Sequence, residues 1–141
     1  MVEDFPVDFL IYESGKNIQF DHFFRNSFMH FYLRTKDLQD LDKEMRLDIA
    51  RHRCQTICDM AKFLVAVDKE DPNVFYSYIA FTLSESQLFV HFAYTKKSMR
   101  GFGFFQRALR LLKLSATEFY YTLPTKLKKK TYLPEFEKRV L

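Results

Sequence analysis

The sequence has no tryptophan and only three glycines, four prolines and two cysteines. So few glycines and prolines exclude a Gly-rich low-complexity chain. Seventeen phenylalanines and eight tyrosines favour a sheet covered by helices over a coiled coil. The abundance of Phe, Tyr and Lys, together with the few glycines, would suit an AT-rich genome, such as that of a phage or a small bacterium. The 141 residues, 48% of them hydrophobic and 28% charged, predict one globular domain over residues 1–141.

Long apolar runs are also absent, since stretches such as residues 63–67 are far too short to span a membrane. The N-terminus has no basic region followed by an apolar stretch, so no export signal is expected. Cys54 and Cys58 lie four residues apart in a helical pattern, and no distant cysteine exists for a loop-closing disulfide. We therefore expect a soluble cytoplasmic protein in a reducing compartment, without a membrane partner.

Neither sign of charge dominates, because 22 Lys and Arg stand against 18 Asp and Glu, a net charge of +4. This small excess favours an anionic partner without naming one. The lysine run at 126–130 is typical of a solvated surface, and the strands carry no RNA-reading aromatic signature, so nucleic acid is not expected. A metal ion is not expected either. Of His52, Cys54 and Cys58, only the two cysteines share a helix face, so they are better interpreted as core cysteines.

The N-terminal half predicts one strand and two helices. Residues 7–12 form an apolar, partly β-branched run that is typical of a strand. Asn17 is placed to cap a helix whose apolar face has spacings of four, four and three, namely Phe20, Phe24, Phe28 and Phe31. A longer helix is expected over residues 38–60, with an apolar side of Leu41, Met45 and Ile49.

The pattern then changes to the period of two that strands show. Three strands, joined by short turns, are expected to form an antiparallel meander over residues 62–67, 74–83 and 87–95. Alternation in the third strand places Leu88, Val90, Phe92 and Tyr94 on one face, and Phe89, His91 and Ala93 on the other.

A helix over residues 104–116 and a last strand over residues 117–123 complete the pattern. The helix is expected to direct arginines and lysine outward (Arg107, Arg110 and Lys113) and apolar residues inward (Phe104, Ala108, Leu111 and Leu112). The order β-α-α-β-β-β-α-β predicts an α+β fold with a mixed, mostly antiparallel sheet and helices on both faces.

Two of the three glycines fall together in Met99-Arg100-Gly101-Phe102-Gly103, between the last meander strand and the helix. The first amides of a helix have no intrahelical partner and lie at the positive end of its dipole, and glycine lets the backbone approach a phosphate closely. Nearby cations add to this charge, at Lys96, Lys97, Arg100 and Arg107. The motif predicts a pyrophosphate site; the alternative is an ordinary loop whose glycines adopt positive φ.

The run from Tyr94 to Phe105 resembles the GNAT superfamily of acyl-CoA-dependent N-acetyltransferases. Its Arg-Gly-x-Gly-x-Gly/Ala signature is matched at Arg100, Gly101 and Gly103, and the element order over residues 7–123 is also similar. The resemblance implies that acetyl-CoA is bound, its pantetheine arm by the backbone of Ala93, Tyr94 and Thr95. It implies that the pyrophosphate lies on the loop and its flanks, at Lys96, Met99, Arg100, Gly101, Phe102, Gly103 and Phe104.

The resemblance also implies transfer of the acetyl group to a primary amine of a protein or a small molecule. His91 lies four residues before Thr95, where related enzymes often place a carboxylate, and is the candidate base; the alternative is a histidine packed on the sheet. Tyr132 is the candidate acid that protonates the sulfur, and its alternative is a tyrosine that anchors a surface tail.

Two departures from the family pattern favour a second hypothesis. Phe105 stands where the motif ends in a small residue, and its ring is expected to crowd the helix start. The segment after Tyr94 is short for the family's closing elements, so we expect them to be abbreviated or supplied by a second chain. The second hypothesis is a catalytically inactive binding or assembly module of the same fold, acting as a homodimer or with a protein partner.

Overall fold

The computed structural model describes residues 6–121 and 137–140. The described strands form one six-stranded sheet in the order β1-β2-β3-β4-β5-β6, so each strand lies beside its neighbour in sequence. All neighbours are antiparallel except β4 and β5, which run parallel. The strands are β1 (Val7–Glu13), β2 (Lys62–Asp68), β3 (Phe75–Ser84), β4 (Gln87–Thr95), β5 (Glu118–Tyr121) and β6 (Glu137–Val140). The predicted mixed, mostly antiparallel sheet is confirmed.

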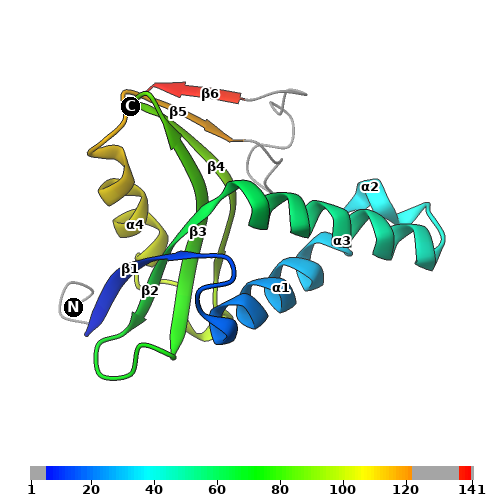
Figure 1. The fold of residues 1–141 in the computed structure, drawn as a ribbon, viewed down its shortest axis with the longest axis horizontal. Helices are drawn as coiled ribbons and strands as arrows, with labels where there is room; N and C mark the ends of the chain where they lie inside the picture. The colour runs from blue at the N-terminus through cyan, green and yellow to red at the C-terminus, as the bar shows by residue number, and fades with distance from the viewer. Residues whose placement is uncertain (1–5, 122–136, 141) are drawn as a thin grey trace.

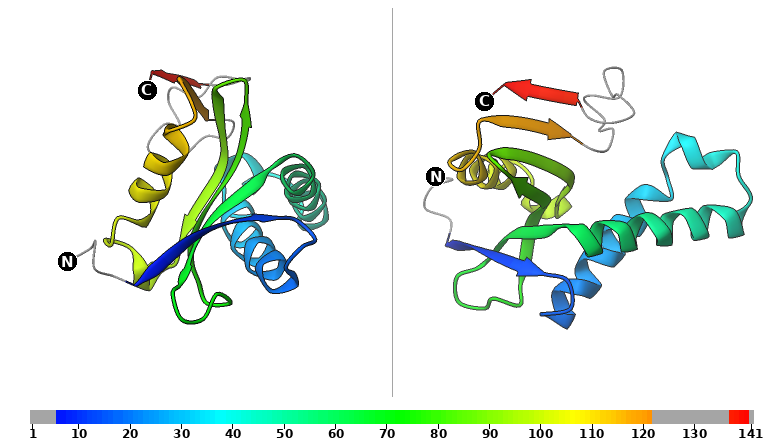
Figure 2. Two further views of the ribbon diagram at one scale, coloured as in Figure 1. Left: turned by 60° about the vertical axis from the view of Figure 1, so that its left-hand side comes forward. Right: turned by 45° about the horizontal axis from the view of Figure 1, so that its top comes forward.

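Helices cover both faces of this sheet, as predicted (Figures 1 and 2). Helices α1 (Ile18–Tyr32) and α3 (Lys43–Met60) lie on one face, and α4 (Phe104–Lys113) lies on the other. The predicted element order is confirmed, with three short additions: α2 (Lys36–Gln39), the 3₁₀ turn η2 (Lys97–Met99) and strand β6. The fold is α+β.

The first helix forms as its capping residue and aromatic spacing predict. The Asn17 side chain accepts the Phe20 amide at 3.0 Å and so satisfies an amide of the first turn. The buried rings of Phe20, Phe24 and Phe28 then meet the sheet, where Phe24 lies 4.8 Å from Phe63 between ring centroids. Such offset and edge-on ring contacts add to the free energy of burial, so this face anchors α1.

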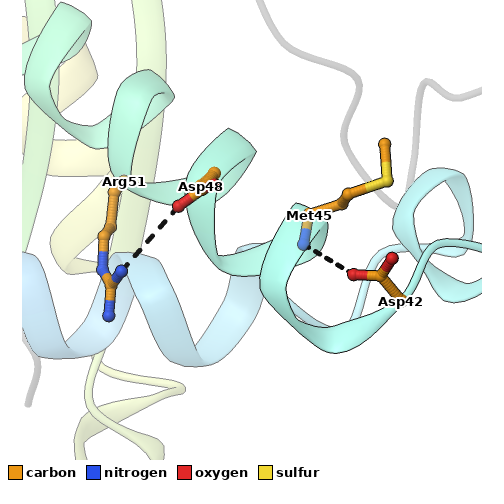
Figure 3. Close-up of polar contacts among 4 residues, drawn as sticks. All are labelled: Asp42, Met45, Asp48 and Arg51. Carbon is orange, nitrogen blue, oxygen red and sulfur yellow. Dashed lines mark hydrogen bonds and ion pairs between the residues drawn. The ribbon is translucent and has the colours of Figure 1, made fainter.

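The expected start and inward face of the long helix were wrong. Asp42 accepts the Met45 amide at 2.9 Å and caps α3, so the helix starts at Lys43 (Figure 3). The buried residues of α3 are Ala50, Cys54 and Ile57, whereas Met45 and Ile49 are exposed. The reason is position, because the N-terminal part of α3 projects with α2 away from the sheet (Figure 1), whereas Cys54 and Ile57, nearer its C-terminal end, pack in the core against the sheet.

The face of α4 is also turned relative to the expectation. Leu109 is buried and Leu111 is 46% exposed, because Phe105 and Leu109 extend the inward stripe on the side away from Leu111. Phe105 is half-buried and packs against the core formed by α4, β3 and β4. Its ring is therefore directed toward the sheet, and the expected crowding of the helix start is wrong.

Strand β4 does not alternate as a regular strand would. Phe81 lies opposite Val90 whereas Ala80 lies opposite Phe92, so His91 is an extra residue in a β-bulge. The bulge reverses the faces of the strand beyond it. Leu88 and Val90 pack in the core beneath α4, whereas Phe92 and Tyr94 pack in the core beneath α1. The prediction that these four residues share one face was wrong, because period-two alternation assumes an uninterrupted ladder.

Candidate functional site at the open edge of β4

Among the described strands, the C-terminal half of β4 has a neighbour on one side only. Strand β5 pairs with β4 from Gln87 to Val90, and among the described strands none pairs with β4 beyond that point on this edge. Strand β3 continues beside β4 as far as Thr95. The peptide groups after the bulge therefore line an edge that could accept another extended chain.

The register shows which backbone groups face this edge. The Lys96 amide donates to the Tyr76 carbonyl at 2.9 Å. Because hydrogen-bonded pairs alternate along an antiparallel ladder, Tyr94 turns its amide and carbonyl toward β3, whereas Ala93 and Thr95 turn theirs to the open edge. The Thr95 carbonyl is there reached by Arg100 Nε at 3.2 Å. Of the three predicted strand residues, two present their backbone at the edge, and Tyr94 instead packs its ring 5.9 Å from that of Phe23.

The glycine loop connects this edge directly to the start of α4. Gly101 and Gly103 have φ of 94° and 75°, in the left-handed region that favours glycine. The first helical bond joins the Arg107 amide to the Gly103 carbonyl at 2.9 Å, so the amides of residues 104–106 precede the helical ladder. Together with the helix dipole, these first-turn amides favour an anion at this position.

The predicted aromatic residues of the loop are used in packing. Phe104 is buried and stacks on Tyr76 at 5.8 Å and on Phe102 at 5.9 Å between ring centroids. Met99 packs against the small core that Phe104 forms with Val7 and Ala66. The Arg107 guanidinium lies 5.3 Å from the centre of the Phe9 ring, which holds this cation beside the helix start. These side chains fix the loop, so its contribution to anion binding would come from its backbone and its cations.

The predicted cations diverge in position. Arg100 is exposed and bridges back to the edge of β4, as described above. Lys96 Nζ lies 5.6 Å from the Phe23 ring, on the side of α1. Lys97 is exposed in η2. The structure thus places Arg107 beside the helix start and Arg100 at the edge of β4, and it directs Lys96 toward α1.

His91 occupies the bulge, where β4 and β5 part. It is 6% exposed, and its Nε2 lies 2.8 Å from Thr82 Oγ1. Thr82 donates its only hydroxyl proton to the Met60 carbonyl at 3.1 Å, so His91 Nε2 carries the proton of the other hydrogen bond. Burial, and secondarily the charge of Arg53, lower the pKa of His91 to about 4. The imidazole is therefore neutral at pH 7 and is a weak base.

The remaining candidates divide between described and undescribed parts of the chain. Tyr132 lies outside the described residues. Within residues 6–121 and 137–140, no group of three or more His, Cys, Asp or Glu side chains is arranged to hold a metal ion. In the same ranges, no helix combines the length and apolar character needed to cross a membrane.

The role of Thr82 was not predicted from the sequence, because only the bulge in β4 brings the His91 ring to the Thr82 hydroxyl.

Comparison with known proteins identifies solved structures of similar fold. The sequence matches no protein-family model and no curated protein. Solved structures do match: a Lactobacillus plantarum protein described as an N-acetyltransferase has a TM-score of 0.56 at 11% identity, covering 90% of this chain and 81% of its own. An acetyltransferase from Thermus thermophilus has a TM-score of 0.54 at 13% identity, covering 96% and 97%.

A chain in the crystal structure of the NatC complex bound to Gag peptide and CoA also matches, with a TM-score of 0.53 at 11% identity and 94% of each chain covered. At these identities the likeness concerns the fold. The protein has a GNAT-like fold across most of its length, as the loop motif predicted.

Proposed function

We propose that the protein is an N-acetyltransferase that uses acetyl-CoA to acetylate a primary amine of a protein or a small molecule. The observation that carries this proposal is the open edge of β4, which leads without interruption into the glycine loop and the start of α4. The fold supports it, since solved acetyltransferases share it and one matching structure contains CoA.

The residues at the edge fit the chemistry of coenzyme A. Its pantetheine arm carries amide groups, which the backbone of Ala93 and Thr95 would pair with as a neighbouring strand does. Its pyrophosphate would be held by the first-turn amides of α4, with Arg100 and Arg107 adding positive charge. When bound, acetyl-CoA supplies a thioester, and the acceptor amine must lose a proton to attack it directly, without an acetylated enzyme intermediate.

Two roles are open for His91 in this reaction. As a base, it would take the proton of the attacking amine, directly or through water, from its position where β4 and β5 part. As a packed residue, it would hold the bulge through Thr82 and so shape the edge. Its low pKa and its bond to Thr82 support the second role. Tyr132 is proposed as the acid on the resemblance alone.

Calorimetry of acetyl-CoA with the full chain tests the proposal. We expect binding with a stoichiometry of one site per chain, and competition by CoA at the same site. A chain that is folded by circular dichroism but binds neither compound would contradict the enzyme proposal and favour the binding or assembly module.

A further inference from the structure

Strand β1 forms one rim of the sheet and, among the described strands, pairs only with β2 (Figure 2). All seven of its residues stand in one continuous register with β2, from Val7 opposite Asp68 to Glu13 opposite Lys62. The other edge of β1 therefore presents a row of backbone groups over the whole strand. Such an edge is a template for pairing with another extended chain.

The hydrogen-bond pattern shows which backbone groups of β1 face outward. The Lys69 amide donates to the Pro6 carbonyl at 3.1 Å, so these two residues form a hydrogen-bonded pair. Because such pairs alternate along an antiparallel ladder, every second residue after Pro6 is bonded to β2, namely Asp8, Leu10 and Tyr12. The residues between them turn their amides and carbonyls away from β2, namely Val7, Phe9 and Ile11. These groups are placed to bond an incoming strand.

The side chains of β1 do little to prevent such pairing. Edge strands are commonly protected by lysine, by proline or by a bulge. Residues 7–13 contain neither lysine nor proline, and their two carboxylates lie near the ends of the strand. In the middle, Leu10 is 37% exposed and Ile11 is 58% exposed, on opposite faces of the sheet. The centre of β1 thus favours a partner strand whose centre is also apolar.

We propose that the edge of β1 joins two copies of this chain into a dimer with one continuous sheet. The strand is complementary to itself when it pairs antiparallel about Leu10. In this register Leu10 lies opposite Leu10 of the second copy, and Ile11 lies opposite its Phe9, so that apolar side chains meet on both faces. Phe9 and Ile11 also carry outward backbone groups, and such a pair exchanges two hydrogen bonds.

The charges of β1 agree with a second copy as the occupant. Like charges directly opposite each other destabilise a strand pair. In the register about Leu10, each carboxylate of β1 lies opposite an uncharged residue of the second copy: Asp8 opposite Tyr12, and Glu13 opposite Val7. Glu13 is also diagonal to Phe9 of the second copy, on the face where the Arg107 guanidinium lies 5.3 Å from the centre of that ring. An acidic strand end thus meets the side of a basic helix.

This interface lies apart from the open edge of β4, because β2 and β3 separate the two edges. Dimerisation through β1 therefore does not depend on the proposed function.

Sedimentation of the full-length chain over a concentration series tests the interface. A single strand pair buries less than the ~1,600 Å² of a standard interface, so we expect a monomer–dimer equilibrium with a roughly micromolar dissociation constant. The pairing closes on itself, so no species larger than a dimer is expected. Ile11→Lys should weaken dimerisation about tenfold or more, since a lysine on the edge opposes pairing. Leu114→Lys, at an 81% exposed position after α4, is the matched control and should dimerise as wild type does.

A cysteine cross-link tests the register. Leu10→Cys should form a disulfide between two copies under mild oxidation, because directly opposite residues of a pair without hydrogen bonds have Cα atoms ~4.5 Å apart. Asp8→Cys is the matched control, since its two introduced thiols would lie roughly 13 Å apart along the strands and out of reach of each other. Peptide mass spectrometry maps the linkage, with the wild-type chain as the background for Cys54 and Cys58.

Four results would overturn the proposal. They are a wild-type chain that stays monomeric throughout the series, assembly into species larger than a dimer, a dimer that Ile11→Lys leaves as stable as wild type, and failure of Leu10→Cys to cross-link two copies. The cross-link decides the question even where Ile11→Lys fails to fold.

Discussion

His91 and Thr82 are hydrogen-bonded across the bulge of β4, with Nε2 and Oγ1 2.8 Å apart, and the Thr82 hydroxyl in turn donates to the Met60 carbonyl in the last turn of α3. The Thr82 hydroxyl thus links the bulge of β4 to the C-terminal end of α3 through two hydrogen bonds. A protonated imidazole could keep the same donor bond, but it would place a buried charge beside Arg53. The protonation of His91 is therefore linked to the stability of the fold.

We expect acid to destabilise the protein through His91. The unfolded chain takes up this proton near pH 6.5 and the folded chain only near pH 4, so the penalty is absent above pH 6.5, grows as the pH falls and is complete below pH 4. It amounts to about 2–3 kcal/mol at pH ~4.5. Urea unfolding of wild type and His91→Gln at both ends of this window measures it. An equal loss in the two proteins would assign the acid sensitivity to other groups.

Kinetics of His91→Ala separate the two roles of this residue. A base role predicts turnover lowered by about 10²–10⁴-fold with acetyl-CoA affinity retained, and a wild-type rate that rises with pH through a midpoint near 4. A packing role predicts a lower melting temperature from the cavity, with activity reduced only in proportion to folded protein. Thr82→Val is the companion variant, since it removes the hydroxyl and leaves the imidazole present.

Gly103→Glu should abolish acetyl-CoA binding. The carboxylate would stand at the N-terminus of α4 and repel the phosphates that the site is proposed to hold. Gly103 also has a φ of 75°, so any side chain introduces backbone strain. Gly103→Asn controls for this, because asparagine tolerates the left-handed region and carries no charge. Calorimetry should show binding by the asparagine variant, and equal affinity of the glutamate variant and wild type would place the cofactor elsewhere.

Phe105→Ala should lower stability and leave acetyl-CoA affinity unchanged. The ring packs against the core under α4 and not over the helix start. Because it is only half-buried, we expect a cost below the 3–5 kcal/mol of a fully buried phenylalanine, about 1–2 kcal/mol. Chemical denaturation and calorimetry of the same variant give both values. A gain in affinity would show that the ring does obstruct the phosphates.

Local signals in the sequence were sufficient for some elements and not for others. Asn17 and the phenylalanines after it were enough to predict both the start of α1 and the face that it buries. Asp42 is a comparable capping signal for α3, but the apolar pattern beginning at Leu38 masked it. The bulge at His91 has no such local signal, because the extra residue is defined only by its pairing with β3.

The strictly sequential order of the sheet has a consequence for how the chain folds. Strands β2, β3 and β4 are joined by short turns, so their pairing closes small loops at little entropic cost. By contrast, β1 pairs with β2 only across the long segment that contains α1, α2 and α3. The parallel pairing of β5 with β4 likewise spans α4, so both pairings close longer loops. The central hairpins are thus favoured as an early nucleus. Strand β4, which carries the bulge and the open edge, belongs to the segment that is free to assemble first.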